Sequence, residues 1–175
     1  MECPDLFHII ADDGTSHWVL GASMDGWGAG SLGTYAYWIG NWDGTRFVTD
    51  NLRPQWLDHG YDWFAAVTWP SADSPQNVRH AVAWMNNWKY AARHVPTLDT
   101  DGYNCQYSVV REIRLCRQPG GWYSLLSAPE PVLATSLLSQ KSLGDVNVNG
   151  RRVLDVTTEA YVLTTDIAWT NATNV

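Results

Sequence analysis

The fold class follows from the stretch Tyr37-Trp38-Ile39-Gly40-Asn41-Trp42-Asp43-Gly44-Thr45-Arg46-Phe47-Val48. An Asp-Gly pair stands here between two short segments rich in aromatic and β-branched residues. Glycine readily adopts the backbone conformation that a tight hairpin turn requires, and the flanking residue types favour strands. The stretch therefore predicts a β-hairpin whose turn lies at Asp43-Gly44.

The same pattern of short strand and glycine-bearing turn recurs along the chain. Turn signals include Asp12-Asp13-Gly14, Asp101-Gly102 and Pro119-Gly120-Gly121. Evenly spaced short strands predict an all-β sandwich, barrel or propeller, and only a short connecting helix is expected, near Leu133–Leu138. Besides the hairpin, the expected strands are His17–Ser23, Thr34–Ile39, Phe64–Trp69, Val78–Trp84, Ser108–Cys116 and Trp122–Ser127.

The composition changes near Ser139, which predicts a domain boundary. Tryptophan becomes rare after this point, and Val, Thr, Leu and Asn alternate up to Val175. Asp155–Thr158 and Tyr161–Thr164 are expected to be strands of a different sheet. We predict domains at 1–139 and 140–175, of which the second is too short to bury a core by itself.

Composition and charge exclude several functions. A net charge of −7 and a pI near 5.0, with no Lys/Arg cluster, would repel a phosphate backbone, so no nucleic-acid partner is expected. The apolar stretches fall far short of the ~20 residues of a membrane helix, so no membrane partner is expected either. The cysteines form no CxxC pair and the histidines no HxxxH pair, so we expect no metal and no cofactor.

Eleven tryptophans in 175 residues are unusual. Such side chains serve either as bulky wedges between sheets or as platforms for sugar rings, whose apolar faces stack on indole.

The segment Glu2-Cys3-Pro4-Asp5-Leu6-Phe7 carries the candidate chemistry. Pro4 has no amide hydrogen, so the segment is expected to be an edge strand or the start of a strand. Paired glycosidase carboxylates stand about 5–5.5 Å apart in retaining enzymes and about 6.5–9.5 Å apart in inverting ones. Three residues along a regular strand span roughly 10 Å, and the odd offset directs the two side chains to opposite faces. Asp5 is therefore expected to be structural.

Glu2-Cys3-Pro4-Asp5-Leu6-Phe7 resembles the signature around the acid/base glutamate of glycoside hydrolase family 32, the invertases, levanases and inulinases. In the same order, the segment 57–66 resembles the Asp-x-Gly-x-Asp-Phe-Tyr-Ala segment of the family, and the segment 82–91 its Trp-x-x-Asn-Trp segment. The hairpin 37–47 and Arg111-Glu112-Ile113 are weaker matches. The resemblance covers roughly residues 2–135.

This resemblance implies the later blades of a five-bladed β-propeller, followed by the start of a β-sandwich module. It also implies a retaining glycosidase that hydrolyses terminal fructosyl linkages in fructans, such as levan or inulin, or in sucrose. The Asn-Asp-Pro-Asn-Gly motif of the family's nucleophile and its Arg-Asp-Pro motif are absent from the sequence. Both lie upstream of the glutamate motif in the family, so the chain resembles a downstream portion that is expected to be inactive alone. The missing N-terminal half of the propeller is its expected partner, and the resemblance is compatible with a secreted parent enzyme.

By the same resemblance, Glu2 is the general acid/base and Asp62 a sugar-contacting carboxylate, while Asp58 is a weaker candidate. Trp84 and Trp88 would share one face if their segment were a strand, so that one could stack on fructose while the other packs. Asn87 could bind a sugar hydroxyl or cap the backbone. Two alternatives stay open, a non-catalytic carbohydrate-binding module and one half of a split enzyme.

Overall fold

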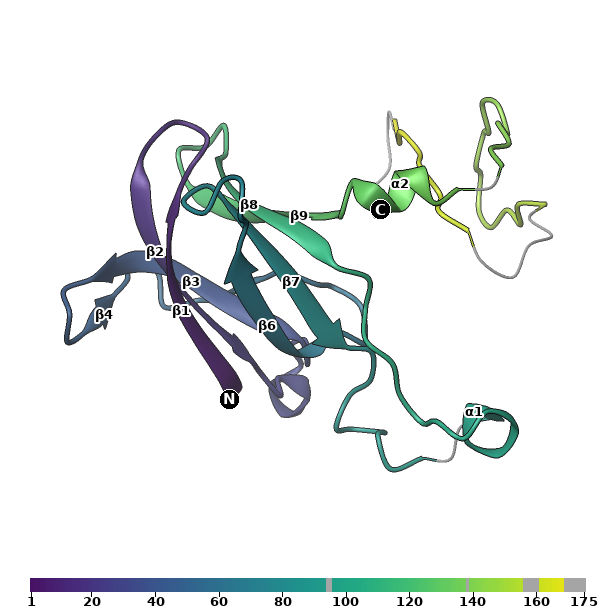
Figure 1. The fold of residues 1–175 in the computed structure, drawn as a ribbon, viewed down its shortest axis with the longest axis horizontal. Coiled ribbons are helices and arrows are strands. Elements are labelled where there is room, and N and C mark those ends of the chain that lie inside the picture. The colour runs from purple at the N-terminus through teal and green to yellow at the C-terminus, as the bar shows by residue number, and fades with distance from the viewer. Residues whose placement is uncertain (94–95, 138, 156–160, 169–175) are drawn as a thin grey trace. The chain divides into compact units, whose positions relative to one another are not determined.

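The computed structural model describes residues 1–93, 96–137, 139–155 and 161–168. The chain divides into two compact units, Met1–Leu137 and Leu138–Val175. All the strands found in these described residues belong to the first unit, which is built almost entirely from antiparallel strands (Figure 1). The expected all-β fold class is thereby confirmed.

The first sheet contains five strands. They are β1 (Glu2–Ile10), β2 (Ser16–Ser23), β3 (Tyr35–Trp42), β4 (Phe47–Val48) and β5 (Gln55–Trp56). Their order is β1-β2-β3-β4, and β5 pairs with β3 beside β4, which leaves β1 at one edge as expected for a segment that contains Pro4. One 3-10 turn, η1 (Trp27–Ala29), lies between β2 and β3.

The predicted hairpin is present between β3 and β4. Gly44 has φ of +96°, the left-handed conformation that the turn needs. The carboxylate of Asp43 accepts the backbone N–H groups of Arg46 at 2.7 Å and Thr45 at 2.8 Å, and these bonds lower its pKa. The turn thus holds itself with local hydrogen bonds, which is why the sequence alone could place it.

The second sheet contains four strands in the order β6-β7-β8-β9. They are β6 (Phe64–Pro70), β7 (Val78–Trp84), β8 (Arg111–Arg117) and β9 (Tyr123–Pro129). A short helix α1 (Pro96–Thr100) lies between β7 and β8, and one helical turn, α2 (Val132–Thr135), follows β9 near the place expected for a connector. The expected strands are confirmed to within a few residues at their ends.

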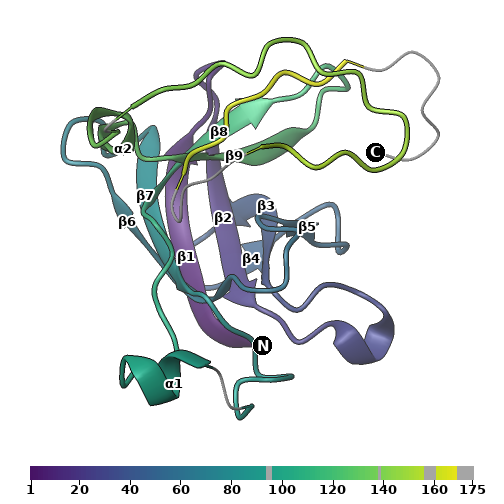
Figure 2. The same ribbon diagram turned by 90° about the vertical axis from the view of Figure 1, so that its right-hand side faces the viewer.

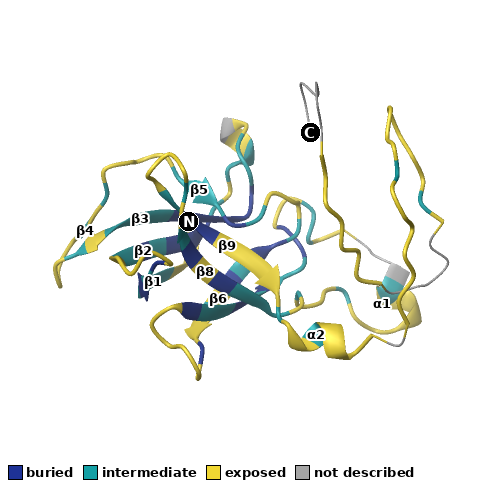
Figure 3. Cartoon of the chain, turned by 90° about the horizontal axis from the view of Figure 1, so that it is seen from above, coloured by how far each residue is buried: buried dark blue, intermediate teal, exposed yellow. Residues whose placement is uncertain are grey.

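The core of the first unit lies between the two sheets, where buried residues from both meet (Figure 3). Alternate residues of each strand point inward, as the two-residue period of a strand requires. On β1 these are Phe7 and Ile9, and on β3 they are Tyr35 and Tyr37. The second sheet contributes Ala66, Ala81, Ala83, Ile113, Leu115 and Leu125.

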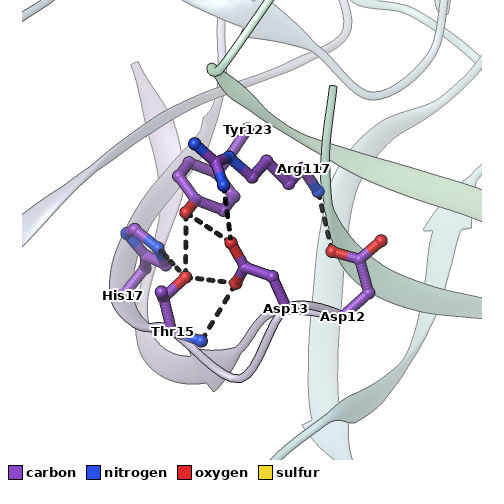
Figure 4. A network of polar contacts seen from close by, with 6 residues as sticks. All are labelled: Asp12, Asp13, Thr15, His17, Arg117 and Tyr123. Carbon is purple, nitrogen blue, oxygen red and sulfur yellow. Dashed lines mark hydrogen bonds and ion pairs between the residues drawn. The ribbon is translucent and has the colours of Figure 1, made fainter. Parts of the chain in front are cut away.

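A polar joint ties the β1–β2 turn to the β8–β9 hairpin (Figure 4). The carboxylate of Asp13 accepts the Thr15 hydroxyl at 2.6 Å and the Tyr123 hydroxyl at 2.9 Å, and its Thr15 hydrogen bonds are the main reason why its pKa falls to about 2. The backbone N–H of Arg117 donates to Asp12 at 2.8 Å. Because β1 runs from Glu2 toward this turn, the joint and Glu2 lie at opposite ends of the strand.

The second unit contains no helix or strand within residues 139–155 and 161–168. The expected strand at Tyr161–Thr164 is therefore wrong: a strand needs a neighbour to pair its N–H and C=O groups, and no strand pairs with these residues in the described part of the chain. Most of the strand expected at Asp155–Thr158 falls outside the described residues. The domain boundary at Ser139 and the sandwich module stay predictions. No helix in the described part of the chain is long and apolar enough to span a membrane.

Candidate active site

The first strand begins with a β-bulge. Glu2 pairs with Ser23 and Asp5 with Gly21, so three steps along β1 face two steps along β2. Cys3 absorbs the extra residue with φ of +47°, a conformation that costs energy for any residue except glycine. Because of the extra residue, Glu2 and Asp5 share one face of the sheet. The expectation of opposite faces was wrong since it assumed a regular strand.

Asp5 uses its carboxylate to bind the second sheet. It accepts the hydroxyl hydrogen of Thr68 on β6, and the Thr68 oxygen in turn accepts the Nε–H of Arg79 on β7 at 2.8 Å. The Arg79 guanidinium lies 4.2 Å from the ring centroid of Phe7. These contacts fit the structural role expected for Asp5.

Glu2 contacts the loop that follows β7. Its Oε2 accepts a hydrogen bond from the indole Nε1–H of Trp88 at 3.0 Å. Figure 2 shows the start of β1 at the same end of the unit as the segment that follows β7. Glu2 is exposed and Trp88 keeps 62% of its surface exposed. The pair thus offers an accessible carboxyl group beside an open indole face.

Trp84 and Trp88 lie together, although not on one strand. β7 ends at Trp84, as the expected strand Val78–Trp84 does, and the chain then turns, so the two side chains do not share one face of a strand. The turn nevertheless brings the two rings to a centroid distance of 5.2 Å, edge to face. Trp84 also packs edge to face against Phe64 at 6.4 Å, and it is only partly exposed. Trp88 is therefore the more exposed of the two indoles, and Trp84 packs against it.

Asn87 uses its whole side-chain amide within the protein. Its Nδ2 donates to the carbonyls of Gly33 at 2.6 Å and Tyr61 at 3.2 Å. Its Oδ1 accepts the indole N–H of Trp27 at 3.2 Å and the backbone N–H of Lys89 at 3.1 Å. An amide can make four such bonds, so this buried side chain has none left for a sugar hydroxyl. Of the two expected roles, backbone capping fits.

Asp62 belongs to the same cluster of loops. Its Oδ1 accepts the hydroxyl hydrogen of Tyr90, whose oxygen also lies 3.2 Å from the Tyr61 carbonyl. Burial, and then the Asp62 carboxylate, raise the pKa of Tyr90, so this hydroxyl remains a donor. Tyr61 and Asn87 link Asp62 to Trp88. The four residues expected in the site therefore form one connected neighbourhood.

Asp58, the weaker sugar-binding candidate, forms an ion pair with Arg111. Its Oδ2 accepts a hydrogen bond from Arg111 at 2.8 Å, and its Oδ1 accepts the N–H of Gly60 at 2.8 Å. The guanidinium of Arg111 also lies 4.6 Å from the ring of Trp63, which is fully buried. These contacts join the loop before β6 to β8.

Sequence reasoning missed an aromatic pair beside this cluster. The rings of Trp27 and Tyr61 are parallel within 10° at a centroid distance of 5.5 Å, and the Lys89 ammonium lies 4.6 Å from the Trp27 ring. A Cβ on Gly33 would lie 2.0 Å from the indole nitrogen of Trp27, so glycine there is what lets the indole pack. The excess of tryptophans was the available signal, but it does not indicate which indoles meet.

Glu2, Tyr61 and Trp88 are exposed at the surface of the first unit. Two surface depressions occur elsewhere, one beside Arg117 and Pro119 and the other beside Asp12 and Asn77, and neither is lined by Glu2 or Trp88. Among the described residues, no group of three or more His, Cys, Asp or Glu side chains could hold a metal ion. The site brings together the Glu2 carboxyl group, the Asp62 carboxylate and exposed aromatic rings.

Comparison with known proteins identifies the family of this chain and several relatives. The family described as "Glycosyl hydrolases family 32 N-terminal domain" matches residues 1–129. A levanbiose-producing levanase of Geobacillus stearothermophilus is 45% identical over 99% of this chain and 44% of its own length. A protein of the same name from Bacillus subtilis is 44% identical over 99% of this chain and 34% of its own length. The chain thus spans less than half of either relative.

Solved structures give the same result. An exo-inulinase from Aspergillus awamori superposes with a TM-score of 0.61 and 26% identity, over 77% of this chain and 26% of its own. A fructofuranosidase from Schwanniomyces occidentalis, complexed with fructose, has a TM-score of 0.58 and 25% identity, over 73% of this chain and 25% of its own. The bulged strand that carries Glu2, the Trp88 loop and the Asp62 segment all fall within the matched residues, and the chain belongs to glycosyl hydrolase family 32.

Proposed function

We propose that this chain is part of a fructan hydrolase that cleaves fructosyl linkages by a retaining mechanism, with Glu2 as general acid/base. The observation that carries the proposal is the hydrogen bond from Trp88 to Glu2, within segments that match the family. Levan is the first substrate to test, since the two relatives that align with 99% of the chain are levanases by name.

In this mechanism, the protonated Glu2 donates its proton to the oxygen of the leaving group. The resulting carboxylate then activates the water that releases the fructosyl unit from the nucleophile. Trp88 orients the carboxyl group through its N–H and offers a ring face to the sugar, while Asp62 accepts hydrogen bonds from sugar hydroxyls.

The nucleophile must come from elsewhere. Asp5 shares a face with Glu2, but it is engaged by Thr68. No Asn-Asp-Pro-Asn-Gly motif occurs in the 175 residues, so we assign the nucleophile to a segment outside them. The chain alone is then expected to release negligible sugar from levan, inulin or sucrose. Release that disappears on Glu2→Gln would contradict this expectation.

Two further properties belong to the proposal. An enzyme that releases levanbiose, as the two levanases are named, must hold two fructosyl units on one side of the cleaved bond, and we extend this requirement to the present chain. We also propose that the parent protein is secreted, in line with relatives named extracellular exo-inulinases, one of which is 29% identical over 85% of this chain.

A chimeric enzyme tests the function directly. Residues 1–175 replace the aligned segment of the Geobacillus stearothermophilus levanase, which supplies the remainder of the enzyme. We expect the chimera to hydrolyse levan, Glu2→Gln to lower kcat by about 100-fold or more, and the first-formed product to keep its anomeric configuration. Glu130→Gln is the matched control, since that carboxylate pairs with His80 at 2.9 Å. A folded chimera that leaves levan intact would refute the proposal.

The exposed indole of Trp88 favours a second candidate, a non-catalytic fructan-binding module. Such a module would bind fructo-oligosaccharides in calorimetry and lose this binding on Trp84→Ala or Trp88→Ala. Absence of any binding excludes it.

A further inference from the structure

We propose that Tyr61, Trp27 and Lys89 form a second sugar-binding position beside Glu2 and Trp88. We call these three residues the aromatic platform. Its occupant is one fructosyl unit of a levan-type oligosaccharide, next to the unit whose bond is cleaved. The inference rests on the proposed function and adds the residues that hold the second unit.

The platform presents one open ring face. The Tyr61 side chain is 67% exposed, whereas Trp27 is partly buried. The two rings are stacked in parallel with their centroids 5.5 Å apart. An exposed tyrosine normally loses side-chain freedom when a ligand binds to it. A ring that is already stacked has lost much of this freedom in advance, so less is lost on binding.

Hydrogen bonds hold the Trp27 ring and the backbone of Tyr61 in place. The Tyr61 carbonyl accepts the Asn87 amide at 3.2 Å, and the Tyr90 hydroxyl oxygen lies 3.2 Å from the same carbonyl. The Trp27 indole N–H donates to the same Asn87 side chain at 3.2 Å, and Asn87 is only 3% exposed. One buried amide therefore binds the Trp27 ring and the Tyr61 backbone, and the Tyr61 ring stacks on the indole that this amide holds.

The platform adjoins the candidate site through the chain itself. Tyr61 precedes Asp62, and Lys89 follows Trp88, whose indole binds Glu2. The Lys89 ammonium lies 4.6 Å from the Trp27 ring and carries three donors for hydroxyl oxygens. Tyr61 and Trp88 are also linked through Asn87, whose amide donates to the Tyr61 carbonyl at 3.2 Å and which directly precedes Trp88, so we place the second unit next to the one bound at Trp88.

The chemistry of this surface selects a neutral polyhydroxylated ring. An aromatic face accepts the apolar face of a sugar, and the ammonium and the Asp62 carboxylate supply a donor and an acceptor for its hydroxyls. An anionic ligand is disfavoured, because the platform carries a single cation next to a carboxylate on a chain of net charge −7.

Nuclear magnetic resonance of the 175-residue chain tests this inference. The indole N–H signals of Trp27 and Trp88 are followed while fructose or levanbiose is added. We expect fructose to shift the Trp88 signal, levanbiose to shift both signals, and levanbiose to bind about tenfold more tightly, the magnitude of one ring stack. Tyr61→Ala should abolish this tenfold preference, and Tyr61→Phe should retain it.

Trp122→Ala is the matched control, because it removes a ring that is 54% exposed in the β8–β9 turn. Equal affinity for the two sugars, or an unchanged preference in Tyr61→Ala, would overturn the second position. The proposed function survives that outcome if fructose still shifts the Trp88 signal. If neither sugar shifts either indole, the platform and the proposed sugar site both fail.

Discussion

The indole Nε1–H of Trp88 donates a hydrogen bond to Oε2 of Glu2 at 3.0 Å, across 86 residues of sequence. Glu2 lies at the bulged start of β1 in the first sheet, and Trp88 lies in the loop that follows β7 of the second sheet. Their contact places the proposed acid/base beside the exposed indole of Trp88, the proposed sugar-binding ring, before any ligand binds.

Trp88→Phe tests the value of this contact, since it removes the N–H donor and keeps an aromatic face. In the levanase chimera we expect kcat/KM for levan to fall by about 5- to 20-fold, the range of one hydrogen bond to a charged group near the surface. Trp122→Phe, the same change at another exposed indole, should leave kcat/KM within twofold. Equal values for wild type and Trp88→Phe would show that the indole N–H has no part in catalysis.

Asn87→Ala should destabilise the first unit more than any exposed asparagine does. The substitution removes the hydrogen-bond partner of the Gly33 carbonyl, the Tyr61 carbonyl and the Trp27 indole N–H. All three bind the Asn87 side chain, which is 3% exposed. We expect a loss of about 2–3 kcal/mol in the free energy of unfolding, measured in urea. Asn51→Ala is the control, because this exposed side chain accepts only the backbone N–H of Arg53, at 3.0 Å. Its substitution should lower the free energy of unfolding by well under half as much.

Gly21→Ala should disrupt the core. A Cβ at this position would lie 1.8 Å from the hydroxyl oxygen of Tyr35 and 2.2 Å from its ring, and this side chain is fully buried. The expected cost is about 3 kcal/mol or more in the free energy of unfolding. Gly28→Ala adds the same methyl group where no atom lies within 4 Å, and its unfolding midpoint should match the wild type. Similar stability for both variants would contradict the close packing of the Tyr35 ring against Gly21 of β2.

The joint in Figure 4 should make the stability of the first unit depend on pH in two steps. Burial lowers the pKa of His17 below its ordinary value of 6.5, against the opposing charge of Asp13, and His8 lowers it further. A lowered histidine pKa favours the neutral ring in the folded state. The contribution of His17 is therefore complete above pH 6.5 and is lost as the pH falls below that value.

Asp13 produces the second step. Its pKa is about 2 in the folded protein against 3.8 ordinarily, so its contribution is present above pH 3.8 and is lost as the pH falls through about 2. Urea midpoints between pH 8 and pH 2 would measure both steps. His17→Gln should flatten the first and Asp13→Asn the second, whereas His59→Gln, an exposed histidine, should change neither. A first step of unchanged size in His17→Gln would assign it to another group.

Features held by local contacts could be predicted from the sequence. The Asp43-Gly44 turn is closed by hydrogen bonds from residues two and three positions away, and β7 lies where Val78–Trp84 was expected. The segments around Glu2, Asp62 and Trp88 were recognised by resemblance, and the family match covers them. The expected strand at Tyr161–Thr164 failed because residue preference alone does not supply a pairing partner.

Sequence by itself thus determined the antiparallel strands, their turns and the family of this chain, because these depend on residue type and on neighbours in the chain. Tertiary structure decided how the site is assembled. The bulge at Cys3 reversed the expected direction of Asp5 relative to Glu2, a turn rather than a strand set Trp88 against Trp84, and Asn87 joined Trp27 to Tyr61. Each of these contacts depends on packing between segments far apart in the chain, and the alternation of residues along a strand carries no record of it.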